Sequence, residues 1–227
     1  MKPANTFHSA NKDRWDAASD HWRQSADSRG LWRRCPTEPE LVLSDKELHY
    51  LAGIAGKRVC VLGSGDNQVV FALAGLDALV TSVDISRNQL QVAQQRSREL
   101  GLSIEFVQAD VTDLSVLQAG SFYVVYTGGH VALWVSDLWK YYAESARILA
   151  PGGLLMISEY HPFRRIWKDS TTTLSVASRY LDRGPFGYDD TDDVLSKKRG
   201  SLKSYERHWT IADYLNSVIS SGSHSFR

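Results

Sequence analysis

The chain has 227 residues, of which 43% are hydrophobic and 23% charged, a balance typical of one folded domain rather than a disordered chain. Lysine and arginine number 26 together, as do aspartate and glutamate, so no basic excess favours a nucleic-acid partner. The N-terminus has no apolar signal core and no apolar run approaches the ~20 residues that cross a bilayer, so we expect a cytoplasmic protein with no membrane partner.

Residues 1–57 are predicted to be an N-terminal extension of helices and loops. Trp15, Trp22 and Trp32 stand out in this polar stretch. One interpretation is that they anchor the extension on the main domain. The other is that they form a lid over a pocket, since aromatic faces suit stacking on rings.

From residue 58 the pattern alternates between strands and helices. The apolar run 58–62 predicts a buried strand, residues 67–75 a helix, and residues 79–83 a second strand rich in β-branched side chains. Ser86 is the expected N-cap of a helix that reaches Leu100 and ends at Gly101. Cys60 lies inside the first strand, so we expect a small buried side chain and no disulfide.

The alternation continues through the second half of this region. Residues 104–107 and 122–126 predict two more strands, and Ser136 is the expected N-cap of a helix to Leu149. Residues 151–153, Pro-Gly-Gly, are expected to end that helix and lead into a strand at 154–158. This order predicts right-handed crossovers and a doubly wound, mostly parallel α/β sheet with helices on both faces, in a domain spanning 58–227.

Residues 160–204 are less regular and are predicted to be an insertion on the substrate side of the domain. The acidic cluster at Asp189, Asp190, Asp192 and Asp193 is interpreted as a solvated loop, and we expect no metal. Residues 210–221 predict a last helix.

A glycine loop follows the first strand. Gly63, Ser64 and Gly65 let the backbone approach a ligand, and the helix that begins near Asn67 offers unpaired N–H groups. A tight turn would also need these glycines, so the loop alone is weak support for a ligand.

Two carboxylates extend the pattern. Asp84 ends the second strand about twenty residues after the glycine loop, where a carboxylate accepts from both ribose hydroxyls of an adenosine. Asp110 follows the third strand and is placed to accept from an adenine amino group. Gln68 occupies the third glycine position of the dinucleotide fingerprint, which disfavours NAD.

These motifs, with those at 126–129 and 149–154, resemble the class I S-adenosylmethionine (AdoMet)-dependent methyltransferase family, a Rossmann-like fold, over residues 55–159. The resemblance implies that AdoMet binds and leaves as S-adenosyl-L-homocysteine. It places the methionine part over the glycine loop, the ribose on Asp84, and the sulfonium near Thr127 and Gly128. The cofactor residues it predicts are Gly63, Ser64, Gly65, Asn67, Asp84, Ile85, Asp110, Val111, Thr127 and Gly128.

The chain departs from the family at three points. The usual acidic residue two positions before the first glycine is Val61, and the usual third glycine is Asn67. Asp66 or Asn67 is then the candidate for binding the amino-acid end of the cofactor. The chain also stops about where the family's last two strands begin, so we expect a sheet without these C-terminal strands.

Methyl transfer to an oxygen, nitrogen or carbon nucleophile of a small molecule is the predicted function. His130 is the candidate catalytic base because its imidazole can take a proton near neutral pH, and Glu159 also follows a strand end. Trp134, Tyr160 and His161 are the candidate substrate-binding residues. The alternatives are an AdoMet-binding protein without catalysis and, less favoured, an NAD-dependent oxidoreductase; the oligomeric state is not predicted.

Overall fold

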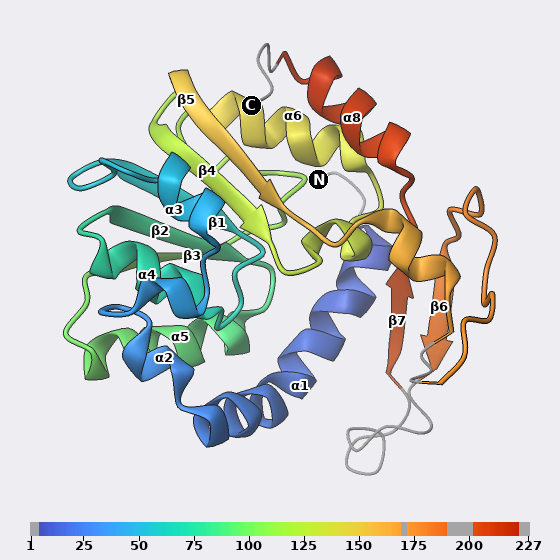
Figure 1. Ribbon diagram of the computed structural model, residues 1–227, viewed down its shortest axis with the longest axis horizontal. Coiled ribbons are helices and arrows are strands. Elements are labelled where there is room, and N and C mark those ends of the chain that lie inside the picture. Colours follow the sequence, from blue (N-terminus) through green and yellow to red (C-terminus); the bar gives the residue numbers. More distant parts are fainter. Residues whose placement is uncertain (1–4, 169–171, 190–201, 223–227) are drawn as a thin grey trace.

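Five parallel strands form the central sheet of the computed structural model, which describes residues 5–168, 172–189 and 202–222. Their order across the sheet is β3-β2-β1-β4-β5 (Figure 1). The strands are β1 (Arg58–Leu62), β2 (Leu79–Asp84), β3 (Ile104–Gln108), β4 (Phe122–Gly128) and β5 (Leu149–Ser158). The predicted α/β class with a doubly wound parallel sheet is confirmed, with the order reversing between β1 and β4.

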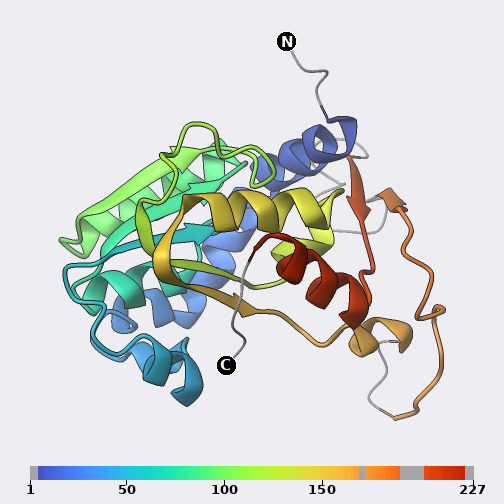
Figure 2. The ribbon, with the colours of Figure 1, turned by 90° about the horizontal axis from the view of Figure 1, so that it is seen from above.

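Helices cover both faces of the sheet because alternate strand residues point to opposite sides. On one face lie α4 (Gln68–Gly75) and α5 (Arg87–Glu99), and on the other lie α6 (Leu138–Ile148) and α8 (Ile211–Ser220). Val59 and Val61 of β1 contribute to the first core, whereas Cys60 and Leu62 contribute to the second. Figure 2 shows α6 and α8 lying side by side on their face of the sheet.

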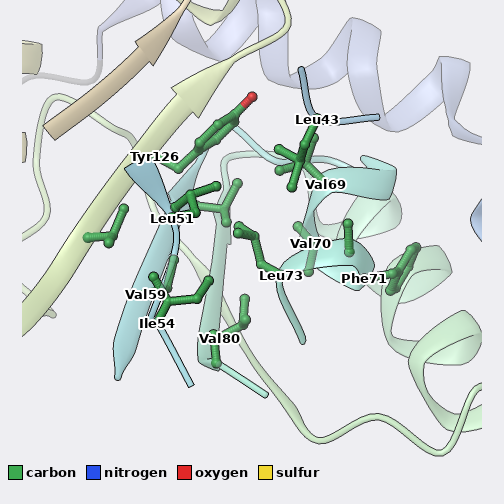
Figure 3. Close-up of a cluster of buried hydrophobic side chains, with 14 of the residues drawn as sticks. Leu43, Leu51, Ile54, Val59, Val69, Val70, Phe71, Leu73, Val80 and Tyr126 are labelled. Carbon is green, nitrogen blue, oxygen red and sulfur yellow. The ribbon is translucent and has the colours of Figure 1, made fainter. Parts of the chain in front are cut away.

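The first core joins the N-terminal extension to the sheet. Leu43, Leu51 and Ile54 of the extension pack with α4 side chains such as Leu73 against β1 and β2 (Figure 3). All of these side chains are at most 2% exposed, so residues 31–57 share the core of the main domain. The elements of this stretch are α2 (Leu31–Arg34), the 3₁₀ turn η1 (Pro39–Leu41) and α3 (Asp45–Tyr50).

Two predicted boundaries in the second half are wrong. Asp137, not Ser136, caps α6, because its side chain accepts from the Lys140 N–H. Ser136 instead binds Asn5 through its hydroxyl. The helix ends at Ile148, and β5 begins at once and runs through the Pro-Gly-Gly segment with an irregular register against β4. By contrast, the cap predicted at Ser86 is confirmed, and the predicted last helix is present as Ile211–Ser220.

Helix α1 (Thr6–Arg29) passes beyond the carboxyl ends of the sheet strands, from β7 toward α2 (Figure 1). A separate antiparallel pair, β6 (Phe186–Asp189) and β7 (Lys203–Glu206), lies at the N-terminal end of α1. In the sequence, this pair follows the 3₁₀ turn η3 (Pro162–Ile166). Within the acidic cluster, Asp189 belongs to β6, and Asp190, Asp192 and Asp193 lie outside the described residues. Among the helices described, none is long and apolar enough to cross a membrane.

Candidate functional site

A cavity of about 660 Å³ opens at the carboxyl ends of β1 to β4, where the strand order reverses. Ligands of open α/β sheets bind at this kind of switch point. Most of the predicted cofactor residues line it together: Gly63, Ser64, Gly65, Asn67, Asp84, Ile85, Asp110, Val111 and Gly128. Helix α1 forms the opposite wall with His8, Asn11, Trp15, Trp22, Ala26 and Arg29.

The glycine loop between β1 and α4 has a backbone that requires glycine. Gly63 and Gly65 have φ of 61° and 50°, a left-handed conformation that other residues rarely adopt. A Cβ on Gly63 would also lie 2.5 Å from the Val131 side chain. Asn67 then caps α4 by accepting from the Val69 N–H at 3.0 Å. The loop therefore brings bare backbone and a helix N-terminus to the cavity, as a ligand with a carboxylate requires.

Asp84 connects this loop to β2. One carboxylate oxygen accepts from the Gly65 N–H at 2.7 Å and the other from the Ser86 N–H at 2.7 Å. Burial raises the pKa of Asp84 to about 6, and the nearby carboxylates of Asp16 and Asp66 act in the same direction. Each oxygen keeps a lone pair for a ligand hydroxyl.

Gln89, which the sequence analysis did not single out, lies beside Asp84 in the cavity wall. Its side-chain oxygen is buried and has no hydrogen-bond partner among the described residues. That oxygen and the Asp84 Oδ2 both lie 3.8 Å from where a Cβ of Gly65 would be, so they face the same space. Buried acceptors are nearly always paired, so this pair fits a ligand that presents hydroxyl groups, such as an adenosine ribose. In the sequence, Gln89 could have been noticed only from its position three residues after Ser86, the N-cap of α5.

Asp110 lies in the cavity wall but already holds several donors. One oxygen accepts from the Thr112 N–H and hydroxyl at 2.8 Å each, and the other contacts His8 Nδ1 at 2.6 Å. These bonds lower the pKa of Asp110 against the opposing effect of burial. His8 also accepts from the Ser136 N–H at 2.9 Å through its other ring nitrogen, so α1 is fixed at this wall. The part of Asp110 in binding adenine stays a prediction.

The end of β4 is closely packed, and the backbone that follows it is strained. A Cβ on Gly128 would lie 2.8 Å from the Ser158 carbonyl oxygen, and Gly129 and His130 follow with φ of 69° and 71°. His130 thereby turns into the cavity, as predicted. Thr127 does not line the cavity: its side chain is buried and its hydroxyl binds that of Tyr141. Because successive side chains of a strand point to opposite faces, the Thr127 side chain points away from the face of Gly128 and into the packed interior.

Aromatic side chains surround the end of the cavity beyond the glycine loop. Trp15 of α1 lies edge-on to Trp134 with ring centroids 5.1 Å apart, and Tyr160 lies over His130 at 3.8 Å. Trp22 contacts Trp15 at 6.2 Å. Trp15, Trp22, Trp134 and Tyr160 all line the cavity, so this end suits a planar, largely apolar ligand.

The titratable groups at this end have altered pKa values. Burial and the positive charge of Arg165 lower the pKa of His130, so its ring is neutral near pH 7. Burial raises the pKa of Glu159, directly after β5, to about 7. His161 does not line the cavity: its ring accepts from the Phe163 N–H at 3.2 Å and caps η3. In the described ranges, no group of three His, Cys, Asp or Glu side chains is placed to hold a metal ion.

Comparisons with known proteins agree with this geometry. Residues 60–157 match the family described as "Methyltransferase domain". The chain is 28% identical over 190 residues to a ubiquinone biosynthesis O-methyltransferase of Xanthomonas axonopodis pv. citri (strain 306), a match that covers 82% of this chain and 76% of the relative. A ubiquinone biosynthesis O-methyltransferase of Xanthomonas oryzae pv. oryzae (strain PXO99A) is also 28% identical, with 81% and 74% covered.

Among solved structures, an S-adenosylmethionine-dependent methyltransferase from Mesorhizobium loti is similar with a TM-score of 0.59 at 25% identity, over 77% of each chain. The [4+2]-cyclase SpnF is similar with a TM-score of 0.52 at 21% identity, over 77% of this chain and 53% of the cyclase. The second likeness shows the fold alone, because one fold supports several chemistries.

Proposed function

We propose that this chain is a class I AdoMet-dependent methyltransferase with a Rossmann-like domain, and that it methylates a hydroxyl oxygen of a small aromatic molecule. The choice of oxygen is supported by the two relatives, both named ubiquinone biosynthesis O-methyltransferase. The proposal competes with the two alternatives named from the sequence, a binding protein without catalysis and an NAD-dependent oxidoreductase.

Residues at the carboxyl ends of β1 and β2, and in the helices that follow these strands, would hold the cofactor. Asp84 and Gln89 offer acceptors to the ribose hydroxyls, and the glycine loop with the α4 N-terminus offers N–H groups to the methionine carboxylate. Asp66 lies beside that loop and pairs with the buried Arg96 at 2.5 Å. When bound, the cofactor supplies an electrophilic methyl group on a sulfonium.

The observation that carries the proposal is the aromatic end of the cavity with His130 in it. Its rings come from α1, from the 3₁₀ turn η2 (Val131–Trp134), and from the segment after β5. A planar acceptor stacked there would point its hydroxyl toward the end of β4. Holding two reactants in line provides a large part of the rate enhancement of such a transfer.

His130 is the proposed base. Its neutral ring accepts the proton of the acceptor hydroxyl at an imidazole nitrogen, while the oxygen forms its bond to the methyl carbon and the carbon–sulfur bond breaks. The products are the methyl ether, S-adenosyl-L-homocysteine and a protonated His130, which then releases its proton to water. A base of this kind contributes about 10²–10⁴ in rate.

A panel of acceptors tests the proposal. The protein is incubated with AdoMet carrying a labelled methyl group and with matched pairs of aromatic compounds, each with a hydroxyl or an amine at the same ring position. We expect label in the methyl ethers of the phenols, with release of S-adenosyl-L-homocysteine. Transfer to the amines alone, or to neither class while AdoMet binds, would contradict it.

A further inference from the structure

Glu159 lies directly behind the turn that presents His130. Its Oε1 accepts from the Ala132 N–H at 3.3 Å, and the backbone of Ala132, His130 and Val131 favours the ionised form of this carboxylate. A backbone N–H directed at an anion stabilises its charge. Here the anion is a side chain of the protein itself, supplied by the end of the neighbouring strand.

The turn needs such a partner because its backbone is unfavourable. Gly129 and His130 are both left-handed, and His130 is one of only two described residues other than glycine with a positive φ. A bulky side chain keeps this conformation only where surrounding contacts fix it. On the other side, Trp209 Nε1 donates to the Ala132 carbonyl at 2.9 Å, so the turn is held from two directions.

Several titratable groups of neighbouring elements lie near Glu159 and affect its pKa or are affected by its charge. Burial is the main cause of its raised pKa, and the backbone hydrogen bonds and Arg165 of η3 oppose it. Glu159 lines a small pocket of about 10 Å³, whose other titratable lining residues include His130, Tyr160, His161, Arg165 and His208. The remaining titratable neighbours are tyrosines of β4, α6 and α8: Tyr126, Tyr141, Tyr142 and Tyr214.

We propose that Glu159 is a positioning residue, whose carboxylate binds the backbone of the 130–132 turn and so sets where the His130 ring lies in the cavity. The inference rests on the proposed function for the use it gives to His130, whereas the contact between Glu159 and the turn stands on its own. It adds a residue outside the large cavity to the catalytic machinery.

A pH dependence follows from this arrangement. The ionised carboxylate is the stronger acceptor for N–H groups, and its protonation weakens these bonds. Since the pKa of Glu159 is about 7, the turn is held firmly above pH 7 and loosens as the pH falls through this value. The pKa of His130 is lowered below its ordinary value, so loss of its own basicity occurs at a lower pH.

The first test compares the pH profiles of kcat for the wild type and for Glu159→Gln. We expect kcat of the variant to fall by up to about 100-fold at pH 8, as for a misplaced reacting group. We also expect the acid limb, centred near pH 7 in the wild type, to move to lower pH. The matched control is Glu144→Gln, which removes a carboxylate that accepts from the Leu114 N–H at 2.7 Å on the far side of α6. The control should keep the wild-type profile.

A second test does not depend on turnover. The amide resonances of residues 130–132 are followed by NMR from pH 5.5 to 8.5 in wild-type protein saturated with S-adenosyl-L-homocysteine. All three should titrate together with a midpoint near 7, and they should not do so in Glu159→Gln. Amides that ignore pH in this range, or that titrate equally in the variant, would overturn the inference. If the amides titrate but no acceptor is methylated, the proposed function fails and the role of Glu159 stands.

Discussion

Asp84 shows how one side chain serves both the fold and the ligand. From the sequence, Asp84 was predicted only as an acceptor for the ribose hydroxyls of a ligand. The structure instead gives both its oxygens to backbone N–H groups, at Gly65 and Ser86. Asp84 therefore fixes the glycine loop against β2 as well as facing the cavity. Its replacement should affect loop order and ligand binding together.

Asp84→Asn should weaken AdoMet binding by about 1–3 kcal/mol, as for lost charge-assisted hydrogen bonds, when measured by calorimetry at pH 7.5. Glu105→Gln is the control, since Glu105 binds Thr81 on β2 outside the cavity. Equal dissociation constants for wild type and Asp84→Asn would remove Asp84 from the site.

Asp84→Asn should also change the pH dependence of stability without ligand. The folded-state pKa of about 6 lies above the ordinary value of 3.8, so the folded protein binds this proton more tightly than the unfolded chain. The contribution of Asp84 to stability is then fully present below pH 3.8 and is lost as the pH rises through 6, by up to about 3 kcal/mol. Urea titrations of both proteins over this range should show a smaller loss of unfolding free energy in Asp84→Asn than in the wild type. Parallel curves of unfolding free energy against pH would contradict this prediction.

At the scale of elements, the N-terminal extension has two parts with different roles. Trp32 of α2 is 2% exposed and packs on Phe71 of α4 with centroids 6.5 Å apart, so it anchors the extension. Trp15 and Trp22 of α1 instead line the cavity. The anchoring interpretation thus describes Trp32, whereas the place of Trp15 and Trp22 in the cavity wall fits the lid interpretation, which stays a prediction. Sequence could not separate them, because all three lie in similarly polar surroundings.

Trp32→Ala and Trp15→Ala should separate these roles. Removing a buried tryptophan costs about 3–5 kcal/mol of unfolding free energy, so Trp32→Ala should lower the urea midpoint strongly. Trp15→Ala should lower it less and should weaken ligand binding in the cavity. Calorimetry with S-adenosyl-L-homocysteine and denaturation of both variants provide the comparison. If Trp15→Ala is the more destabilised of the two, α1 is a core element and not a wall of the site.

Local signals explain which elements could be predicted. The bounds of β1 to β4, of the helix capped by Ser86 and of the last helix were predicted within a residue or two, because apolar runs and local capping signals mark them. The start of α6 was misplaced because Ser136 and Asp137 are both good caps and only tertiary contacts decide. The extension of β5 across Pro151 was missed because pairing with β4 overrides the local turn signal.

At the scale of the whole molecule, α1 closes the site by contacts far apart in sequence. Asn11 binds the backbone of Tyr205 in β7 in both directions, at 2.9 and 2.8 Å, and Asp16 accepts from the Ser86 hydroxyl at the start of α5. Near its end, Asp27 accepts from the buried Arg96 at 2.9 Å. Glu159 was a candidate from its place at a strand end, but Gln89 and these α1 contacts could not be predicted from sequence, since each depends on residues brought together only by the fold.

Deleting residues 1–30 should therefore damage both ligand retention and stability. The cavity loses the α1 wall, and Arg96 loses Asp27 and the Arg23 carbonyl while keeping Asp66. We expect a folded protein with a lower melting temperature and S-adenosyl-L-homocysteine binding weakened by at least tenfold. Circular dichroism and calorimetry measure the two effects. Unchanged affinity in the shortened protein would show that α1 does not contribute to the site.

The most direct test of the proposed mechanism is the turnover of His130→Asn against the wild type, with AdoMet affinity measured in both. Asparagine tolerates the left-handed backbone of this position, so the turn should persist while the base is removed. The account predicts an unchanged dissociation constant and a kcat lower by about 10²–10⁴ on a phenolic acceptor. Equal kcat with equal affinity would contradict it and show that His130 is not the base.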